Sequence, residues 1–493
     1  MTVFLLLAPV VVPLLGAALY LAAGWRPATR WVSAGSAAVT LAAAVALAVT
    51  VAVSGPRTAL GGPARADALS AFMLIVIAAV GLLATAATPA YLRAEIDSGR
   101  ATPRTATRHS VLVQLFLAAM ALAVLAADLG VLWVAIEATT IVTAFLVGQR
   151  RTRQAVEAAW KYVVICSAGI ALALLGTFLL NYAAQHAPGT PGLDLAALTH
   201  AAPGLDPGVT RIAIALLIIG FGTKAGLAPL HAWLPDAHSQ APAPVSALMS
   251  GVLLSVAFYA ILRVKVIADA VLGTGFARTL LIVMALASLV LAASLLLAQR
   301  DYKRMLAYSS IEHLGLVALG AAVGSPLALA AALLHVLGHG LVKGVLFLTA
   351  GRVLQTEHTS RIDGVRGLAA RQPVLAGCLG LGVLALIGLP PFSVFASELG
   401  IARTGFTAGL GWVTTAVLAL VVVIAAALIT HTGRMVLGAP AEGPGAATAP
   451  GRLPGTFAAT VIAGLVASAV LGLTAGPLGS LLHLAADTLT GAP

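Results

Sequence analysis

Long apolar stretches recur from one end of the chain to the other, separated by short segments rich in arginine, glycine and proline. A helix of about 20 apolar residues is long enough to cross the hydrocarbon core of a bilayer. The pattern therefore predicts an all-α polytopic membrane protein with fourteen spans. These are Val3–Ala22, Trp31–Val53, Ala68–Leu92, Ser110–Ala127, Leu129–Gly148, Trp160–Ala183, Val209–Ala228, Pro244–Val264, Arg278–Ala298, Met305–Val323, Leu327–Leu354, Pro373–Ile401, Leu410–His431 and Phe457–Ala475.

Two of these spans contain prolines that predict broken helices. Pro229 follows Lys224 in the seventh span, and Pro390 and Pro391 interrupt the twelfth span ahead of Glu398. Proline removes a backbone donor, and non-helical backbone is tolerated at membrane depth only beside protein or water. The breaks are five spans apart, an odd number, so the units that contain them would have opposite orientations. Paired broken spans of this kind are typical of inverted-repeat transporters.

The five-span separation of the two breaks predicts a division of the chain into four parts. Residues 1–109 hold spans one to three, and residues 110–265 hold the first five-helix inverted repeat, spans four to eight. Residues 266–434 hold the second repeat, spans nine to thirteen, and residues 435–493 hold span fourteen and a tail.

Composition supports a membrane protein, since 60% of the residues are hydrophobic and only 9% are charged. A soluble globular domain has about 25% charged residues. No lysine or arginine precedes the first apolar run, so a cleaved secretory signal is not expected. Cys166 and Cys378 each lie within an apolar run, and this spacing predicts neither a disulfide framework nor a metal site.

Basic residues are distributed unevenly among the loops. Of the 28 lysines and arginines, 18 follow odd-numbered spans, 7 follow even-numbered spans, and 3 lie in or at the edge of spans. The positive-inside rule then predicts a cell-membrane protein with odd loops in the cytoplasm and both termini outside. The net charge of +11 thus indicates topology and no nucleic-acid surface. An alternative for the loop Arg352–Arg371 is a basic face that docks an acidic partner.

The few ionisable residues within spans are the first candidates for function, because charge at membrane depth is costly and is usually retained for a role in transport. Glu137 is surrounded by apolar residues, and a lysine that approached or withdrew would change its affinity for a proton. Lys224 is the expected partner. The alternative is a structural ion pair. Lys161 follows Glu157 by four residues, so it is either part of a proton path or a lysine paired across one helical turn.

Three titratable residues of the eleventh span, His335, His339 and Lys343, share one helical face at i, i+4 and i+8. Histidine titrates near physiological pH and passes protons through either ring nitrogen. Two histidines one turn apart also bind metals, but the sequence offers neither an HExxH glutamate nor a third ligand, so no metal is expected. Packing histidines are the other alternative.

Glu398, after the second break, would complete a line of buried charges, or else lie at the membrane interface. His231 is a further candidate for the proton path, where it would line an entrance, or else cap the broken helix. Secondary candidates are His238, with the same two alternatives, and Glu312 and His313, which would bridge the repeats or bond between helices. No nucleotide-binding loop, iron–sulfur cysteine set or nucleophile elbow occurs. We therefore expect no cofactor and no catalytic residue.

Two long motifs resemble those of a known family. The segment from Thr223 to Pro242 (TKAGLAPLHAWLPDAHSQAP) and the segment from Gln299 to Gly315 (QRDYKRMLAYSSIEHLG) resemble the antiporter-like, proton-conducting membrane subunits of respiratory complex I and Mrp-type antiporters. The SSIEH form and the fourteen-span length look closest to component F of hydrogenase-4-type enzymes.

The resemblance implies fourteen helices, two inverted repeats, broken helices seven and twelve, and a row of polar residues at the membrane midplane. It places Glu137, Lys224, His335, His339, Lys343 and Glu398 in that row. Many relatives carry a lysine where this chain has Ser255, so the centre of the path would need water or Ser255. The largest relatives continue with a lateral helix and another span, for which residues 477–493 are expected to be too short.

We therefore predict a proton-translocating membrane subunit of a hydrogenase-4-like or complex-I-like assembly. Its expected partners are other membrane subunits, a peripheral redox module reached through them, protons and the lipid bilayer. One alternative is a sodium/proton antiporter subunit of an Mrp-type exchanger. Another is the membrane subunit of an inorganic-carbon pump, and a stand-alone structural membrane protein is a further one that the buried charges disfavour.

Overall fold

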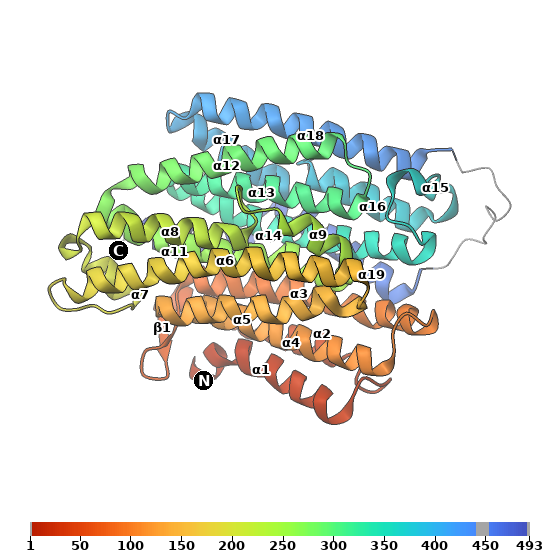
Figure 1. The fold of residues 1–493 in the computed structure, drawn as a ribbon, viewed down its shortest axis with the longest axis horizontal. Coiled ribbons are helices and arrows are strands. Elements are labelled where there is room, and N and C mark those ends of the chain that lie inside the picture. Colours follow the sequence, from red (N-terminus) through yellow and green to blue (C-terminus); the bar gives the residue numbers. More distant parts are fainter. Residues whose placement is uncertain (1, 440–452, 491–493) are drawn as a thin grey trace.

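The computed structural model describes residues 2–439 and 453–490 and is a bundle of long helices that run side by side (Figure 1). The N-terminal helix α1 lies at one edge of the bundle, and α18 lies at the opposite edge. The helices as far as α11 are α1 Thr2–Ala23, α2 Val32–Ser54, α3 Ala68–Asp97, α4 Pro103–Leu125, α5 Leu129–Val147, α6 Arg153–Gln185, α7 Leu195–His200, α8 Pro207–Ala225, α9 Trp233–Gln240, α10 Ala243–Leu248 and α11 Leu254–Leu272. The others are α12 Thr274–Leu297, α13 Tyr302–Val323, α14 Pro326–Glu357, α15 Leu368–Arg371, α16 Pro373–Leu386, α17 Ser393–Thr407, α18 Gly411–Leu437, α19 Gly455–Leu473 and α20 Gly476–Thr490.

The number of long apolar helices agrees with the predicted spans. Within residues 2–439 and 453–490, 13 helices are long and apolar enough to cross a membrane, and α16 is a shorter apolar helix. One of the 13 joins α10 to α11 through a π-helical turn, Met249–Leu253. With α16 as the first half of the broken twelfth span, fourteen spans result. The all-α polytopic fold is confirmed.

Both predicted breaks occur where the prolines lie. α8 ends at Ala225, Gly226 takes the left-handed conformation with φ 79°, and α9 begins at Trp233. The Trp233 indole Nε1 donates to the Thr223 carbonyl at 2.9 Å, and the same oxygen accepts from the Gly226 N–H at 3.2 Å, so the end of α8 is held from both sides of the break. The second break separates α16 from α17 and contains Pro390 and Pro391. Each break thus gives the chain short helical ends inside the bundle.

Residues 243–262 of the span made of α10 and α11 are buried, and α14 packs against α10, α13, α16, α17 and α3. Gly251 and Gly340 meet where the π-helical turn crosses α14, and a Cβ on Gly340 would lie 2.7 Å from the Gly251 carbonyl oxygen. Small residues let membrane helices approach this closely. α14 is therefore held at the centre of the bundle, together with the polar side chains that it carries.

Some features were not predicted. A hairpin of β1 (Arg57–Ala59) and β2 (Ala64–Ala66) pairs Arg57 with Ala66, and α20 forms a helix that packs against α3 and α14. The segment that forms α20 was expected to belong to a tail. The ends marked N and C in Figure 1 lie in the half of the molecule that also holds β1 and α7. Arg452, counted among the basic loop residues, lies outside the described residues. The division of the chain into two inverted repeats stays a prediction.

Candidate functional site

Lys224 is fully buried at the end of α8, next to the first break. Its Nζ donates to Thr140 Oγ1 of α5 at 2.8 Å and to the hydroxyl of Tyr162 on α6, and it lies 4.7 Å from the centre of the Tyr162 ring. A buried ammonium group needs such partners, because removing it from water without compensation is very costly. The described partners of Lys224 are thus hydroxyls and an aromatic face, which carry no charge.

Glu137 is partly buried on α5, one helical turn before Thr140. Its Oε2 is buried without a hydrogen-bond partner among the described residues, and no ion pair joins it to Lys224 there. The predicted direct Glu137–Lys224 pair is therefore absent from the described structure. Both side chains nevertheless belong to one region, because Lys224 binds the turn of α5 that follows Glu137.

Lys161 differs from Lys224 in being 48% exposed. It pairs with Glu157 at 2.8 Å across one turn of α6 and with Asp236 of α9 at 3.0 Å. Arg304 of α13 also pairs with Asp236. Lys161 thus has the local partner that its structural interpretation predicted, and it belongs to an ion-pair network that ties α6, α9 and α13 together.

The short helix α9 connects the surroundings of Lys224 to those of Lys343. At its start, Trp233 packs edge-on against Tyr162 with ring centres 5.0 Å apart. At its other end, the buried His238 stacks on Phe347 of α14 at 4.7 Å, and neither ring nitrogen has a hydrogen-bond partner among the described residues. Phe347 lies one helical turn after Lys343. By contrast, His231 lies in the break and is partly exposed, with its Nδ1 3.2 Å from the Pro229 carbonyl oxygen.

Serine hydroxyls connect the π-helical turn to the surroundings of Lys343. Ser250, in that turn, is 2.7 Å from Ser310 of α13, measured between Oγ atoms. Ser310 also donates to the Leu306 carbonyl at 3.1 Å, and Lys343 donates to the same carbonyl. Ser255 is buried on α11, and its Oγ has no hydrogen-bond partner among the described residues.

Lys343 is fully buried at the centre of α14. Its Nζ donates to the Leu306 carbonyl at 2.6 Å and to Ser309 Oγ at 2.5 Å. Like Lys224, it is solvated by uncharged oxygen atoms of neighbouring helices. The two lysines thus occupy equivalent chemical settings on α8 and α14.

Three histidines cluster beyond Lys343. His313 Nδ1 of α13 lies 3.0 Å from His335 Nε2 of α14, and His335 Nδ1 lies 2.9 Å from Ser397 Oγ of α17. The His339 ring is 5.0 Å from that of His313, between ring centres. His335 and His339 share a face of α14, as their spacing predicts, and the structure adds His313 to the same group.

Glu398 of α17 lies beside this cluster and folds back over the second break, where a Cβ on Gly388 would collide with its carboxylate. Its Oε1 is buried without a hydrogen-bond partner among the described residues. Glu312 is buried on α13, and its Oε2 likewise has no described partner. The second break therefore brings a carboxylate close to His313 and His335, a group that does not include His339.

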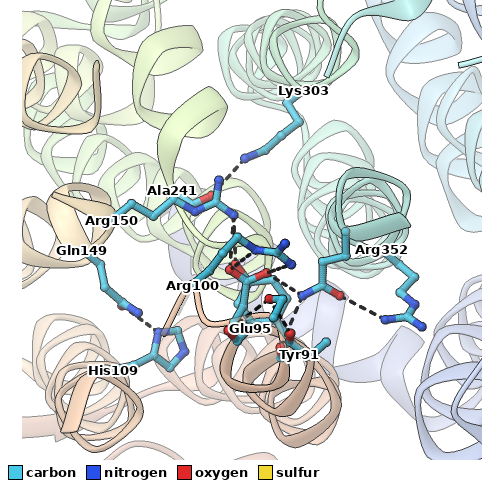
Figure 2. Close-up of polar contacts among 12 residues, drawn as sticks. Tyr91, Glu95, Arg100, His109, Gln149, Arg150, Ala241, Lys303 and Arg352 are labelled. Atoms are coloured by element: carbon cyan, nitrogen blue, oxygen red, sulfur yellow. Dashed lines mark hydrogen bonds and ion pairs between the residues drawn. The ribbon is translucent and has the colours of Figure 1, made fainter. Parts of the chain in front are cut away.

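A further polar cluster, not predicted, joins α3 to α14 and to residues that follow α3 and α5 (Figure 2). The Glu95 carboxylate of α3 accepts from Arg100 at 3.1 and 3.2 Å and from Gln355 of α14 at 2.8 Å. Arg150 donates to the Tyr91 hydroxyl at 3.3 Å. Lys303 donates to the Ala241 carbonyl at 2.9 Å, just past α9. We call Tyr91, Glu95, Arg100, Arg150 and Gln355 the Glu95 cluster.

The residues that sequence reasoning missed are mostly hydroxyl partners of the lysines and histidines. Tyr162, Thr140, Ser309 and Ser397 each lie within hydrogen-bond distance of a predicted site residue. Serine and threonine are common in membrane helices, so their presence alone does not distinguish these positions. The tyrosine that follows Lys161 inside an apolar run was the one available signal.

The chain is similar to known proteins over the region that contains these residues. Residues 126–424 match the transmembrane family described as NADH:quinone oxidoreductase/Mrp antiporter, which is more than half of the chain. The chain belongs to this family. A hydrogenase-4 component F homolog from Methylacidiphilum infernorum is 40% identical over 346 residues, covering 69% of this chain and 72% of that protein.

Two other relatives of the chain extend the comparison. An NADH-quinone oxidoreductase subunit N from Desulforudis audaxviator is 36% identical over 406 residues, covering 80% of this chain and 78% of that protein. A chain in the membrane-bound sulfane sulfur reductase, an archaeal respiratory membrane complex, superposes with a TM-score of 0.86 at 27% identity, covering 99% of this chain and 97% of that one. The predicted family and the antiporter-like, multi-pass membrane subunit are therefore confirmed.

Proposed function

We propose that this antiporter-like subunit translocates protons along the buried polar residues of α5, α8, α14 and α17, driven by electron transfer in partner subunits. One observation carries the proposal. Lys224 and Lys343 are both fully buried, and each is solvated by hydroxyl or carbonyl oxygen atoms. Without a permanent counter-charge, either lysine can lose its proton at a cost that a nearby charge controls. This is the property that a proton path needs.

In the proposed sequence, a change of charge near Glu137 alters the proton affinity of Lys224. The disturbance then passes along α9, whose ends contact Tyr162 and Phe347, to Lys343. Protons cross the interval between the lysines by way of water and the hydroxyls of Ser250 and Ser255. From Lys343 they reach the histidines and leave beside Glu398.

The proposal includes the position of the chain in its assembly. The subunit would lie in the cell membrane with the loops after odd-numbered spans in the cytoplasm and both termini outside, as the 18 to 7 distribution of basic residues predicts. It would work beside other membrane subunits and, through them, with a peripheral redox module. The relatives named for hydrogenase-4 and for NADH-quinone oxidoreductase support this setting.

The test is proton translocation in sealed vesicles that contain the assembled complex and an electron donor. Lys224→Ala should remove most of the translocation, because it removes the buried ammonium group from that part of the path. Lys265→Ala is the matched control, since Lys265 is also buried but pairs with Asp269 on α11. Translocation by Lys224→Ala equal to that of the control would overturn the proposal.

A second function, sodium/proton exchange, uses the same residues. The family description names Mrp antiporters alongside NADH:quinone oxidoreductases, and this observation supports sodium/proton exchange as the second candidate function. Sodium-dependent proton flux in vesicles without any electron donor would select exchange. Flux that requires an electron donor and ignores sodium would select the redox-driven function.

A further inference from the structure

Three side chains with metal-binding atoms meet beyond Lys343, and each comes from a different helix. His313 of α13, His335 of α14 and Glu398 of α17 place one ligand atom each within 4.8 Å of the others. The two imidazoles are hydrogen-bonded, with His313 Nδ1 3.0 Å from His335 Nε2. Only the fold brings these residues together, because His313 and Glu398 are 85 residues apart in the chain.

We propose that His313, His335 and Glu398 form a binding site for a divalent transition-metal ion, for which Zn²⁺ is the best-suited species. The ion would replace the proton that the two imidazoles share. Zn²⁺ binds imidazole nitrogen at about 2.0–2.1 Å, so two nitrogens on a tetrahedral ion lie roughly 3.3 Å apart. The observed separation of 3.0 Å needs to widen by only a few tenths of an ångström.

The donor set matches the chemistry of zinc. Two nitrogens and one carboxylate oxygen form the three-ligand set of zinc sites that keep a fourth position for water. Ser397 Oγ lies 2.9 Å from His335 Nδ1 and so holds the ring with Nε2 directed at His313. Such a second contact fixes ring orientation and raises metal affinity.

A buried polar atom at the site lacks a partner that an ion would provide. Glu398 Oε1 is buried without a hydrogen-bond partner among the described residues. A divalent cation held by Glu398 and by the two facing ring nitrogens, His313 Nδ1 and His335 Nε2, would supply that partner.

Glu398 also borders a small cavity. The cavity lies between α13, α17 and α18, and its other walls include Leu316, Leu319, Ile401 and Thr414. A metal site needs an entry path as well as its ligands, and this mainly apolar cavity is one opening beside Glu398.

Equilibrium binding of Zn²⁺ to the full-length chain, purified in detergent without a histidine tag, tests the proposal. We expect one ion per chain, and at least tenfold weaker binding in His335→Gln and in Glu398→Gln. Ser397→Ala should weaken binding about 10- to 100-fold by releasing the ring. His109→Gln is the matched control, because His109 is a buried histidine that contacts Gln149 in the Glu95 region (Figure 2) and is far from the site in the chain.

Co²⁺ provides a measurement that needs no variant. Bound in place of Zn²⁺, it should show the absorption of a tetrahedral nitrogen- and oxygen-ligated ion, displaced by one equivalent of Zn²⁺. Equal Zn²⁺ affinity in the wild type and in both ligand variants, which would indicate an adventitious ion only, overturns the proposal. So does the absence of binding by the wild type.

One consequence rests on the proposed function. An ion held at these residues would occupy the exit of the proton path, so Zn²⁺ should inhibit translocation by wild-type vesicles. Metal binding without any effect on translocation would retain the site and contradict the exit role. A chain that translocates no protons but binds Zn²⁺ would contradict only the proposed function.

Discussion

At the scale of single residues, Lys224 and Lys343 are buried ammonium groups that uncharged oxygen atoms solvate. Sequence reasoning identified both lysines, because few charges occur inside the apolar runs. It could not identify their partners, since Thr140, Tyr162 and Ser309 lie on helices far away in the chain. Of the two roles weighed for Glu137 and Lys224, the direct ion pair is absent among the described residues, because Thr140 of α5 takes that place beside Lys224. The influence of Lys224 on the proton affinity of Glu137 stays a prediction.

Tyr162→Phe tests the role of the hydroxyl that accepts from Lys224. The change keeps the aromatic ring and removes one hydrogen bond to a charged group, which is worth about 2 kcal/mol. We expect translocation in vesicles to fall about thirtyfold while the yield of folded complex is unchanged. Tyr182→Phe, at an exposed tyrosine of the same helix, should behave as the wild type. A wild-type rate for Tyr162→Phe would mean that Lys224 does not depend on this contact.

At the scale of helices, the two breaks and the polar ties between helices organise the molecule. The prolines made both breaks predictable, because proline interrupts a helix whatever surrounds it. The Glu95 cluster was not predictable, since Glu95 lies at the end of an apolar run and resembles any interfacial glutamate. The structure shows it joining α3 to Arg100 and to Gln355 of α14. Similar unpredicted ties place His313 beside His335.

Glu95→Ala should strongly destabilise the bundle. It leaves the guanidinium of Arg100 and the amide of Gln355 without the carboxylate. A hydrogen bond to a charged group contributes about 1.5–3 kcal/mol, and water replaces part of it for Arg100, whose side chain is 38% exposed. The measurement is thermal unfolding in detergent. Asp97→Ala is the control, because Asp97 lies on the same helix in an ion pair with Arg93 whose two side chains are each 70% exposed. Such a pair contributes less than about 1 kcal/mol. Equal unfolding temperatures for both variants would show that the Glu95 cluster is not a structural tie.

At the scale of the whole molecule, two separate clusters of polar side chains lie inside the bundle. One surrounds Lys224 and the other surrounds Lys343 and the histidines, and α9 touches both. The lengths of the apolar runs predicted the fourteen spans, because a helix that crosses the bilayer needs about 20 apolar residues. The connection between the groups was beyond such reasoning. It depends on contacts between side chains that are distant in the sequence. Ser250 of the π-helical turn and Ser310 of α13, for example, are 60 residues apart.

The most direct measurement is proton translocation by vesicles that carry Lys224→Ala, Lys343→Ala or both changes together. If both lysines act in series on one path, each single change should remove most of the translocation and the double variant should lose no more than either single variant. If the two losses are independent and add, or if either single variant translocates like the wild type, the two groups do not form one path.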